Sequence, residues 1–284
     1  AYLKANYPAI YMSAVLTAES GDVETIGRMV KECKRMGIDV LPPSVNESYS
    51  QFTVPPRENK DDKYKIRFGL TTIKNFGQGV ATSIIEERKK GGKFKSLIDF
   101  LDRVKDKNLN KKSLESLIKA GALDDFAERG EMLVNLETLL AYHKESSSKV
   151  ANQDSLFSGL TGSSALPPLR MVKAEPINKK ERLMWEKELL GLYITGHPLD
   201  EFSEKLDKAK NNSLNIKDAP ENAECVLGGV ITDLRTTLTK AGEMMAFARL
   251  EDLKGSVDMV VFPKVYEEYK EFLQGDQCIA GKGR

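Results

Sequence analysis

The apolar positions of this chain change their period partway along it. Over most of the chain they recur every three or four residues, which is the spacing of one face of a helix. Beyond position 225 they fall into short runs bounded by turn residues, a pattern typical of strands. Helices are predicted over 8–17, 22–36, 80–89, 178–192 and 265–273. Strands are predicted over 226–234, 244–250, 257–262 and 277–281. The sequence therefore predicts a multidomain, mostly α fold with a C-terminal β segment.

A glycine pair interrupts the helical pattern between two apolar stretches. Ile73 and Phe76 lie at the end of a short predicted helix, Gly77 and Gly79 follow as a tight hairpin, and the helix over 80–89 comes next. Glycine permits positive φ and close approach of another backbone, and the first N–H groups of a helix have no partner within it. Such a turn can seat a phosphate. Gly-x-Gly between helices is, however, more often a plain connection, so its surroundings decide the interpretation.

A looser copy of this pattern lies downstream. Leu114, Leu117 and Ile118 run into Gly121, and Ile118-Lys119 stands where Ile73-Lys74 stands in the first copy. Two such units related by a pseudo-twofold axis are predicted to pack into one small helical core. They would present both hairpins to the two strands of a duplex. The second copy lacks Gly-x-Gly, so the phosphate-binding pattern is complete only in the first.

Charge adds to this interpretation. Residues 60–119 hold 16 Lys or Arg against 8 Asp or Glu, in a chain whose net charge is only +1. A basic block is commonly just a solvated face, but one that coincides with a phosphate-binding turn favours nucleic acid. The candidate duplex-DNA contacts are Lys74, Asn75, Gly77, Gln78, Gly79, Val80, Arg88, Lys111, Lys112 and Lys119.

Composition excludes several classes of protein. The 284 residues are 40% hydrophobic and 30% charged, which gives room for two or three modest domains, and no apolar run reaches membrane length. Three cysteines without Cys-x-x-Cys spacing and two histidines indicate neither a zinc site nor a disulfide framework. We expect a cytoplasmic segment of a longer chain, without metal or cofactor of its own.

Three stretches of the N-terminal part carry a family resemblance. They read Ala1-Tyr2-Leu3-Lys4-Ala5-Asn6-Tyr7-Pro8, Cys33-Lys34-Arg35-Met36-Gly37-Ile38 and Leu41-Pro42-Pro43-Ser44-Val45-Asn46-Glu47-Ser48. They resemble the end of the fingers domain of the bacterial C-family replicative DNA polymerases, the DNA polymerase III alpha subunits, and the similarity continues in order along the chain. The resemblance implies the end of the fingers over 1–58, a tandem helix-hairpin-helix duplex-binding domain over 59–145, a linker over 146–176, a helical connector over 177–218 and a partial OB-fold domain over 219–284.

A Ser-, Gly- and Pro-rich stretch over 146–168 contains the pentapeptide Gln153-Asp154-Ser155-Leu156-Phe157. Its surroundings are too polar to be buried, so Leu156 and Phe157 form a candidate anchor, with the Gln153 amide adding a directional hydrogen bond. The alternative is that Leu156 and Phe157 dock on their own domain. The pentapeptide is similar to the internal motif by which this polymerase family binds its sliding clamp, the beta subunit. The resemblance also implies other replisome subunits as partners.

The C-terminal pattern of three strands, a helix and a further strand is the order of an OB-fold, with the last strand missing. The face of such a sheet can hold single-stranded nucleic acid. The candidate contacts are Arg235, Lys240, Phe247, Arg249 and Lys254. Alternation along the strand is predicted to put Phe247 and Arg249 on one face. Similar OB-folds are attached to aminoacyl-tRNA synthetases, so the fold alone does not decide the ligand. Upstream, Trp185 and His197 have no reactive partner within reach by sequence, which favours packing over a site.

The parent family synthesises DNA with two magnesium ions held by palm-domain carboxylates, which in the family precede the fingers. The resemblance therefore implies that this segment is itself inactive. Two alternatives stay open from the residues alone. One is a helix-hairpin-helix repair enzyme, which would use Lys74 or Lys119 with Asp124 or Asp125. The other is a non-enzymatic interaction module.

Overall fold

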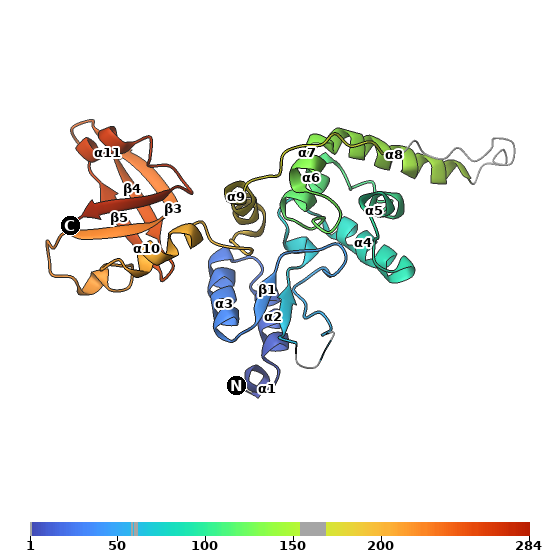
Figure 1. Cartoon of the computed structure of the whole chain (residues 1–284), viewed down its shortest axis with the longest axis horizontal. Coiled ribbons are helices and arrows are strands. Elements are labelled where there is room, and N and C mark those ends of the chain that lie inside the picture. The colour runs from blue at the N-terminus through green and yellow to red at the C-terminus, as the bar shows by residue number, and fades with distance from the viewer. Residues whose placement is uncertain (1, 58, 60–61, 154–168) are drawn as a thin grey trace. The chain divides into compact units, whose positions relative to one another are not determined.

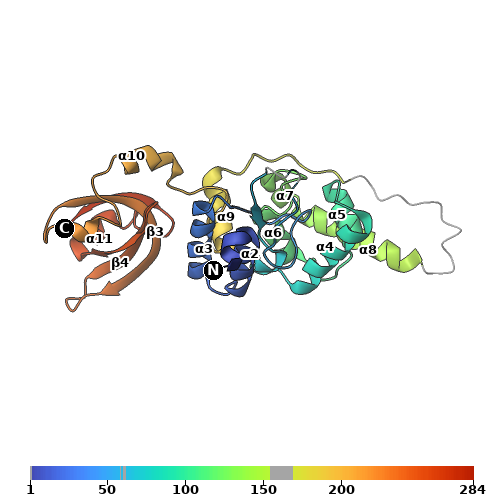
Figure 2. The ribbon, with the colours of Figure 1, turned by 90° about the horizontal axis from the view of Figure 1, so that it is seen from below.

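The computed structural model describes residues 2–57, 59, 62–153 and 169–284. Figures 1 and 2 show the chain in two orientations. Its contacts divide it into two compact units, Ala1–Thr195 and Gly196–Arg284. Each unit is described by itself below.

The first unit is helical apart from one pair of short strands. Its helices are α1 (Tyr2–Asn6), α2 (Pro8–Ala18), α3 (Val23–Arg35), the 3-10 helix η1 (Leu70–Thr72), α4 (Gln78–Gly91), α5 (Leu97–Arg103), α6 (Lys111–Lys119), α7 (Arg129–Val134), α8 (Leu136–Gln153) and α9 (Lys179–Leu190). The strands β1 (Asp39–Leu41) and β2 (Lys65–Arg67) pair in parallel, with Val40 opposite Ile66.

Local sequence signals set several of these helix ends. Asp22 caps α3, because its carboxylate accepts hydrogen bonds from the backbone N–H groups of Glu24 and Thr25. Asn178 caps α9 by accepting from the Glu181 N–H at 2.8 Å. Gly191 ends α9 in the left-handed region, with φ of 84°. The predicted helices over 8–17, 22–36, 80–89 and 178–192 are thereby confirmed within a few residues.

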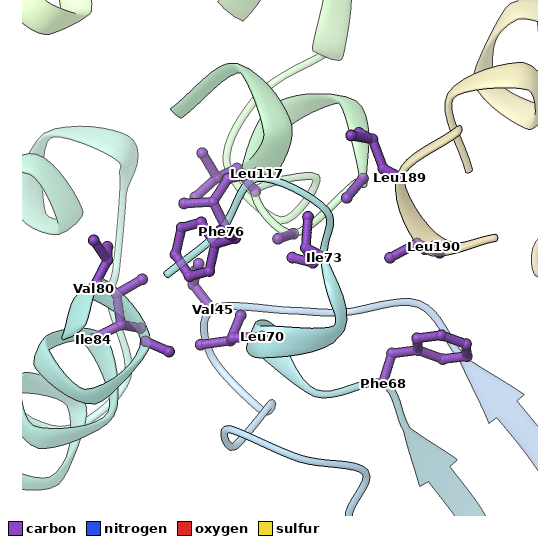
Figure 3. Close-up of a cluster of buried hydrophobic side chains, with 14 of the residues drawn as sticks. Val45, Phe68, Leu70, Ile73, Phe76, Val80, Ile84, Leu117, Leu189 and Leu190 are labelled. Atoms are coloured by element: carbon purple, nitrogen blue, oxygen red, sulfur yellow. The ribbon is translucent and has the colours of Figure 1, made fainter. Parts of the chain in front are cut away.

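One hydrophobic core runs through the first unit. It contains Met12 of α2, Ile84 of α4, Leu117 of α6 and Leu190 of α9, so it crosses both positions 58 and 145. Figure 3 shows the part of this core in which Phe68, directly after β2, gathers with side chains from η1, α4, α6 and α9. The segments on either side of positions 58 and 145 share this core. The domain borders at these two positions stay predictions. The compact second unit begins at Gly196.

The chain before the first hairpin is not the helix that the pattern predicted. Residues 65–77 form β2, the short η1 and a turn. The Leu70 and Thr71 N–H groups bond to the carbonyl oxygens of Tyr49 and Ser50, at 2.8 and 3.1 Å, instead of within a helix. Gly69 permits this approach, because a Cβ there would lie 2.3 Å from the Ser50 oxygen. Contact with a distant segment therefore overrides the helical period.

Helix α8 enters the segment that was predicted to be a linker. The helix continues to Gln153, so residues 146–153 are helical. Ser146 donates a hydrogen bond to the Asp102 carboxylate at 2.6 Å and accepts one from Lys105, while His143 Nε2 lies 2.8 Å from the Val104 oxygen. These polar contacts hold α8 on the loop that follows α5. The first residues of the predicted linker, 146–153, are therefore helical.

The second unit is built on a curled antiparallel sheet. Its elements are η2 (Asp200–Phe202), α10 (Ser203–Asp207), η3 (Ile216–Asp218), β3 (Cys225–Leu238), β4 (Met244–Glu251), β5 (Ser256–Val261), α11 (Pro263–Tyr269) and β6 (Cys278–Gly283). The strand order is β5-β4-β3-β6.

Strand β3 is long enough, at 14 residues, to pair with two neighbours. Its first half pairs with β6 and its second half with β4, and the register shifts between Ile231 and Asp233. Such an irregularity lets a strand bend, which curls the sheet into a half-barrel. Ile231, Leu250 and Leu273 lie in the small core on its inner side. The predicted strands are confirmed, and the curled sheet with its helix fits an OB-like segment.

Candidate nucleic-acid interface

The first hairpin is held in place by two buried side chains that flank an exposed tip. Ile73 and Phe76 are buried in the core, whereas Lys74 and Asn75 between them are exposed. The Lys74 N–H bonds to the Leu189 oxygen at the end of α9, at 2.9 Å. Figure 3 shows Ile73 and Phe76 on the loop that connects η1 to α4. The core and α9 therefore fix the backbone of this hairpin.

The tight turn depends on an asparagine rather than on the glycine pair. Asn75 has φ of 67°, in the left-handed region that Asn tolerates better than most residues. Gly77 has φ of −87° and ψ of 153°, an ordinary extended conformation. The prediction that the glycines supply positive φ is thus wrong. What Gly77 and Gly79 contribute is the absence of side chains at the start of α4.

The N-terminus of α4 is open. Gly77 occupies the N-cap position without a side-chain hydrogen bond, and the Ala81 N–H makes the first bond back to it, at 3.2 Å. Across the residues that the structure describes, no acceptor is bonded to the N–H groups of Gln78, Gly79 or Val80. Unpaired N–H groups and the positive end of the helix dipole favour an anion at this position. A Cβ on Gly77 would meet nothing within 4 Å, whereas one on Gly79 would lie 3.7 Å from the Asp106 carboxylate, so the approach is clear on the Gly77 side.

The second hairpin differs because its helix start is already occupied. The Glu128 carboxylate caps α7 by accepting from the N–H groups of Gly130 and Glu131. The same carboxylate accepts from the Ile177 N–H at 3.1 Å and from Arg182 Nη2 at 2.7 Å. Burial alone would raise its pKa, but these donors outweigh burial and hold the pKa of Glu128 below its usual value. A phosphate could bind here only by displacing Glu128.

The turn of the second hairpin is closed as well. Arg129, which is only 2% exposed, holds the Asp124 carboxylate through Nε at 2.8 Å and Nη2 at 2.6 Å. Its Nη1 donates to the Lys119 oxygen at 2.9 Å and so caps the end of α6. Gly121, with φ of 80°, leaves the space that this guanidinium fills. The asymmetry suggested by the missing Gly-x-Gly thus has a structural counterpart.

The predicted basic contacts fall into two groups. Arg88 donates to the Val45 oxygen at 2.9 Å and lies over the Tyr49 ring, and burial lowers its pKa. Lys111 is paired with Glu137 and Lys119 with Glu115. By contrast, Lys74 and Lys112 are exposed, and no ion pair within the described part of the chain engages them. Lysines at 74 and 112 are therefore the most accessible of the predicted cationic contacts.

The Lys–Asp pair of a repair enzyme does not assemble around the second hairpin. Lys119 pairs with Glu115 at 2.6 Å, and Asp124 is bound by the buried Arg129. Asp125 accepts a hydrogen bond from Ser44 at 3.3 Å. Among the described residues, moreover, no three His, Cys, Asp or Glu side chains gather as a metal site would require. The carboxylates near this hairpin have structural partners.

The sheet of the second unit brings some of its predicted contacts together. Arg235 and Val260 lie on either side of Phe247 in neighbouring strands, so the three form one row on the exposed face. Arg249 lies in the next row, between Asp233 and Asp258. Phe247 and Arg249 thus share a face, as alternation predicted.

The charges on this sheet face are largely balanced. Arg235 Nε lies 3.0 Å from Asp233, and Arg249 Nε lies 3.9 Å from Asp258. Lys240 and Lys254 are located in the turns at opposite ends of β4. The face therefore offers a stacking platform at Phe247, but it has no strong excess of positive charge.

The pentapeptide that was predicted to bind a clamp lies largely outside the described residues. Gln153 is the last residue of α8, and Asp154, Ser155, Leu156 and Phe157 lie outside the described residues. Upstream, Trp185 lies against Lys119, with 5.5 Å between the ammonium and the ring centre, and His197 Nδ1 accepts from the Leu199 N–H at 3.2 Å. Both side chains therefore take part in local packing or turn contacts.

The open hairpin between helices places this chain among the helix-hairpin-helix proteins. The sequence model of the family described as "Helix-hairpin-helix motif" matches residues 37–132, which include both hairpins. No helix in the described ranges is long and apolar enough to cross a membrane.

Relatives identify the family more closely. The chain is 38% identical over 286 residues to DNA polymerase III subunit alpha of Aquifex aeolicus, covering 100% of this chain and 22% of that protein. It is 38% identical to the alpha subunit of Thermus aquaticus, over 97% of this chain and 22% of the relative. It is 37% identical to the alpha subunit of Borreliella burgdorferi, over 100% of this chain and 25% of that protein. The chain belongs to the DNA polymerase III alpha family and spans less than a third of the length of these relatives.

Proposed function

We propose that this chain is the part of a replicative DNA polymerase that holds duplex DNA through its first hairpin and docks on a sliding clamp through residues 153–157. The observation that carries the duplex-binding role is the open start of α4 beside the exposed Lys74. Backbone N–H groups at a helix start bind a phosphate whatever the base sequence, which suits an enzyme that must move along DNA. Synthesis itself, with its magnesium ions, belongs to the whole polymerase.

Only one of the two hairpins takes a phosphate in this proposal. The start of α7 is occupied by Glu128, so the second hairpin serves to hold the segment after it through Arg182 and Ile177. The Glu128 carboxylate takes the place that a phosphate would have. Duplex contacts near the second hairpin then come from exposed side chains such as Lys112. We therefore expect one strand of the duplex to be held more firmly than the other.

Fluorescence anisotropy of labelled duplex DNA tests this role. Affinity should fall steeply between about 50 mM and about 200 mM salt, because phosphate contacts release counterions. A matched single strand is titrated in parallel. Salt-independent affinity, or no duplex binding even at low salt, would show that the hairpin does not hold phosphates.

The clamp-binding role rests on the sequence of the pentapeptide and on the family. A short peptide gains most of its affinity from one or two apolar anchors, at about 1.5 to 3 kcal/mol for each fully buried side chain. Replacing Leu156 and Phe157 by Ala should therefore abolish capture by an immobilised clamp. The matched control replaces Leu160 and Leu166, which flank the motif in the same stretch. Equal loss in both variants would contradict a specific motif.

For the second unit we propose a weaker contact with single-stranded template. Phe247, which is 47% exposed, supplies a ring on which a base can stack, for about 1 to 3 kcal/mol. The paired charges of Arg235 and Arg249 leave little net attraction for phosphates. Phe247→Ala should then weaken binding of a single strand about tenfold with little change in its salt dependence. Undiminished single-strand affinity would remove Phe247 from the site.

A further inference from the structure

Three lysines gather around the far end of α4, away from the hairpin. Lys89 lies in the last turn of the helix, and Lys93 and Lys95 follow directly after its end at Gly91. All three side chains are exposed. No ion pair in the described ranges engages any of them, although many other surface cations of the unit are paired. These three residues are called the distal lysines below.

The backbone that carries Lys93 and Lys95 is firmly anchored. Phe94 between them is only 2% exposed, and its ring meets Phe100 edge-on, with 5.3 Å between ring centres. The Phe94 N–H bonds to Asn46 Oδ1 at 2.8 Å, and Asn46 Nδ2 bonds to the Phe94 oxygen at 3.0 Å. This two-way bond to a residue 48 positions away fixes the loop. The two lysines therefore project from a rigid base.

Cations at the C-terminal end of a helix commonly satisfy its last carbonyl oxygens, and in α4 another residue already does so. Arg103 Nη2 donates to the carbonyl oxygens of Glu87 and Gly92, so it satisfies the end of α4. Its guanidinium also lies 4.4 Å from the centre of the Phe94 ring. Lys90 pairs with the Glu87 carboxylate at 3.1 Å. The distal lysines are therefore not needed to satisfy the carbonyl oxygens at this end of the helix.

A groove leads along α4 from the hairpin toward these lysines. It has a volume of about 380 Å³, with α4 as one wall and the segment 49–53 as the other. Its lining residues are Tyr49, Ser50, Gln51, Thr53, Thr82, Ile85, Glu86 and Lys89. At the hairpin end Gln78 bonds to Ser50 at 3.0 Å, and within the described part of the chain the buried Thr53 hydroxyl lacks a partner. Glu86 is the acidic side chain in this lining.

We infer that the distal lysines are a second phosphate-binding point for the same duplex. This inference rests on the proposed duplex-binding function. Helix α4 has 14 residues, so its two ends lie about 21 Å apart at 1.5 Å per residue. That distance equals about six base-pair steps of roughly 3.4 Å. The N–H groups of the hairpin and the ammonium groups of the distal lysines then hold two sets of phosphates, and α4 acts as a spacer between them.

The test compares the whole chain with two triple variants of equal charge change. One carries Lys89→Gln, Lys93→Gln and Lys95→Gln. The control carries Lys34→Gln, Lys144→Gln and Lys173→Gln, at exposed lysines elsewhere in the same unit. Duplex affinity is measured by anisotropy over a salt series, and thermal unfolding checks that both variants fold. Each lost phosphate contact should reduce the slope of log affinity against log salt by about 0.9.

We expect the distal variant to lose about two to three units of slope and at least tenfold in affinity at low salt, with little change in the control. Equal slopes for the two variants would overturn this inference and leave the hairpin proposal intact. Absence of salt-dependent binding by the unmodified chain would overturn both.

Discussion

Replacing Gly77 and Gly79 by Ala tests the open helix start without disturbing the fold. Gly77 has φ of −87°, which Ala adopts readily, and its new Cβ would stand in open space. A Cβ added to Gly79 would make ordinary contacts, at 3.7 Å from Asp106 Oδ2 and 3.8 Å from Asn108 Nδ2. Both methyl groups would stand at the start of α4, where a phosphate must approach the backbone.

The expected magnitudes for folding and binding differ enough to separate the two effects. Ala inside a helix is favoured over Gly by up to about 1 kcal/mol, whereas Ala is a poorer N-cap than Gly by a similar amount. The free energy of unfolding should therefore change by less than about 1 kcal/mol. Loss of one hydrogen bond between a backbone N–H and a charged phosphate costs about 1.5 to 3 kcal/mol. Duplex affinity should fall by roughly 10- to 150-fold.

The assay is a titration of labelled duplex at low salt, with urea unfolding of each variant. Gly21→Ala is the matched control, because its Cβ would also stand in open space in the same unit. It should leave duplex affinity unchanged. A folded Gly77→Ala, Gly79→Ala double variant that binds duplex as tightly as the unmodified chain would refute the phosphate role of the hairpin.

Three further outcomes are expected. Gly121→Ala should destabilise the first unit by more than about 1 kcal/mol, because φ at this position is 80° and a Cβ would lie 2.2 Å from the buried Arg129 guanidinium. Urea unfolding measures this loss, and unchanged stability would contradict it. Burial opposes ionisation of Asp252, but hydrogen bonds from Ser213 and the following turn outweigh it and lower its pKa. The stability that this carboxylate supplies is therefore present above about pH 4 and lost as pH falls through the lowered pKa. If Asp252→Asn leaves the acid-unfolding curve of the second unit unaltered, this reasoning is refuted. Primer extension with magnesium and all four deoxynucleotides should give no product, whereas extension that survives removal of contaminating polymerase would overturn the assignment of this segment.

The sequence alone predicts the local features of the structure. The caps at Asp22 and Asn178, the left-handed end of α9 at Gly191 and the change to strand period after position 225 each depend on neighbouring residues. Such signals act over one or two helical turns or along one strand, so they survive in the sequence itself. The fold class, the first hairpin as a loop before α4 and the shared face of Phe247 and Arg249 followed from them.

Only tertiary packing decided which of the two hairpins is open. Glu128 closes the second one through partners 49 and 54 positions away, at Ile177 and Arg182. Likewise Arg88 looks like any other residue of a basic run, yet it bonds to the Val45 oxygen 43 positions earlier. The distal lysines are not needed at the end of α4 because Arg103, brought back by α5, satisfies its carbonyl oxygens. Periodicity records which face of a helix is apolar, but pairing between distant polar groups depends on how the elements pack, and packing is a property of the whole core.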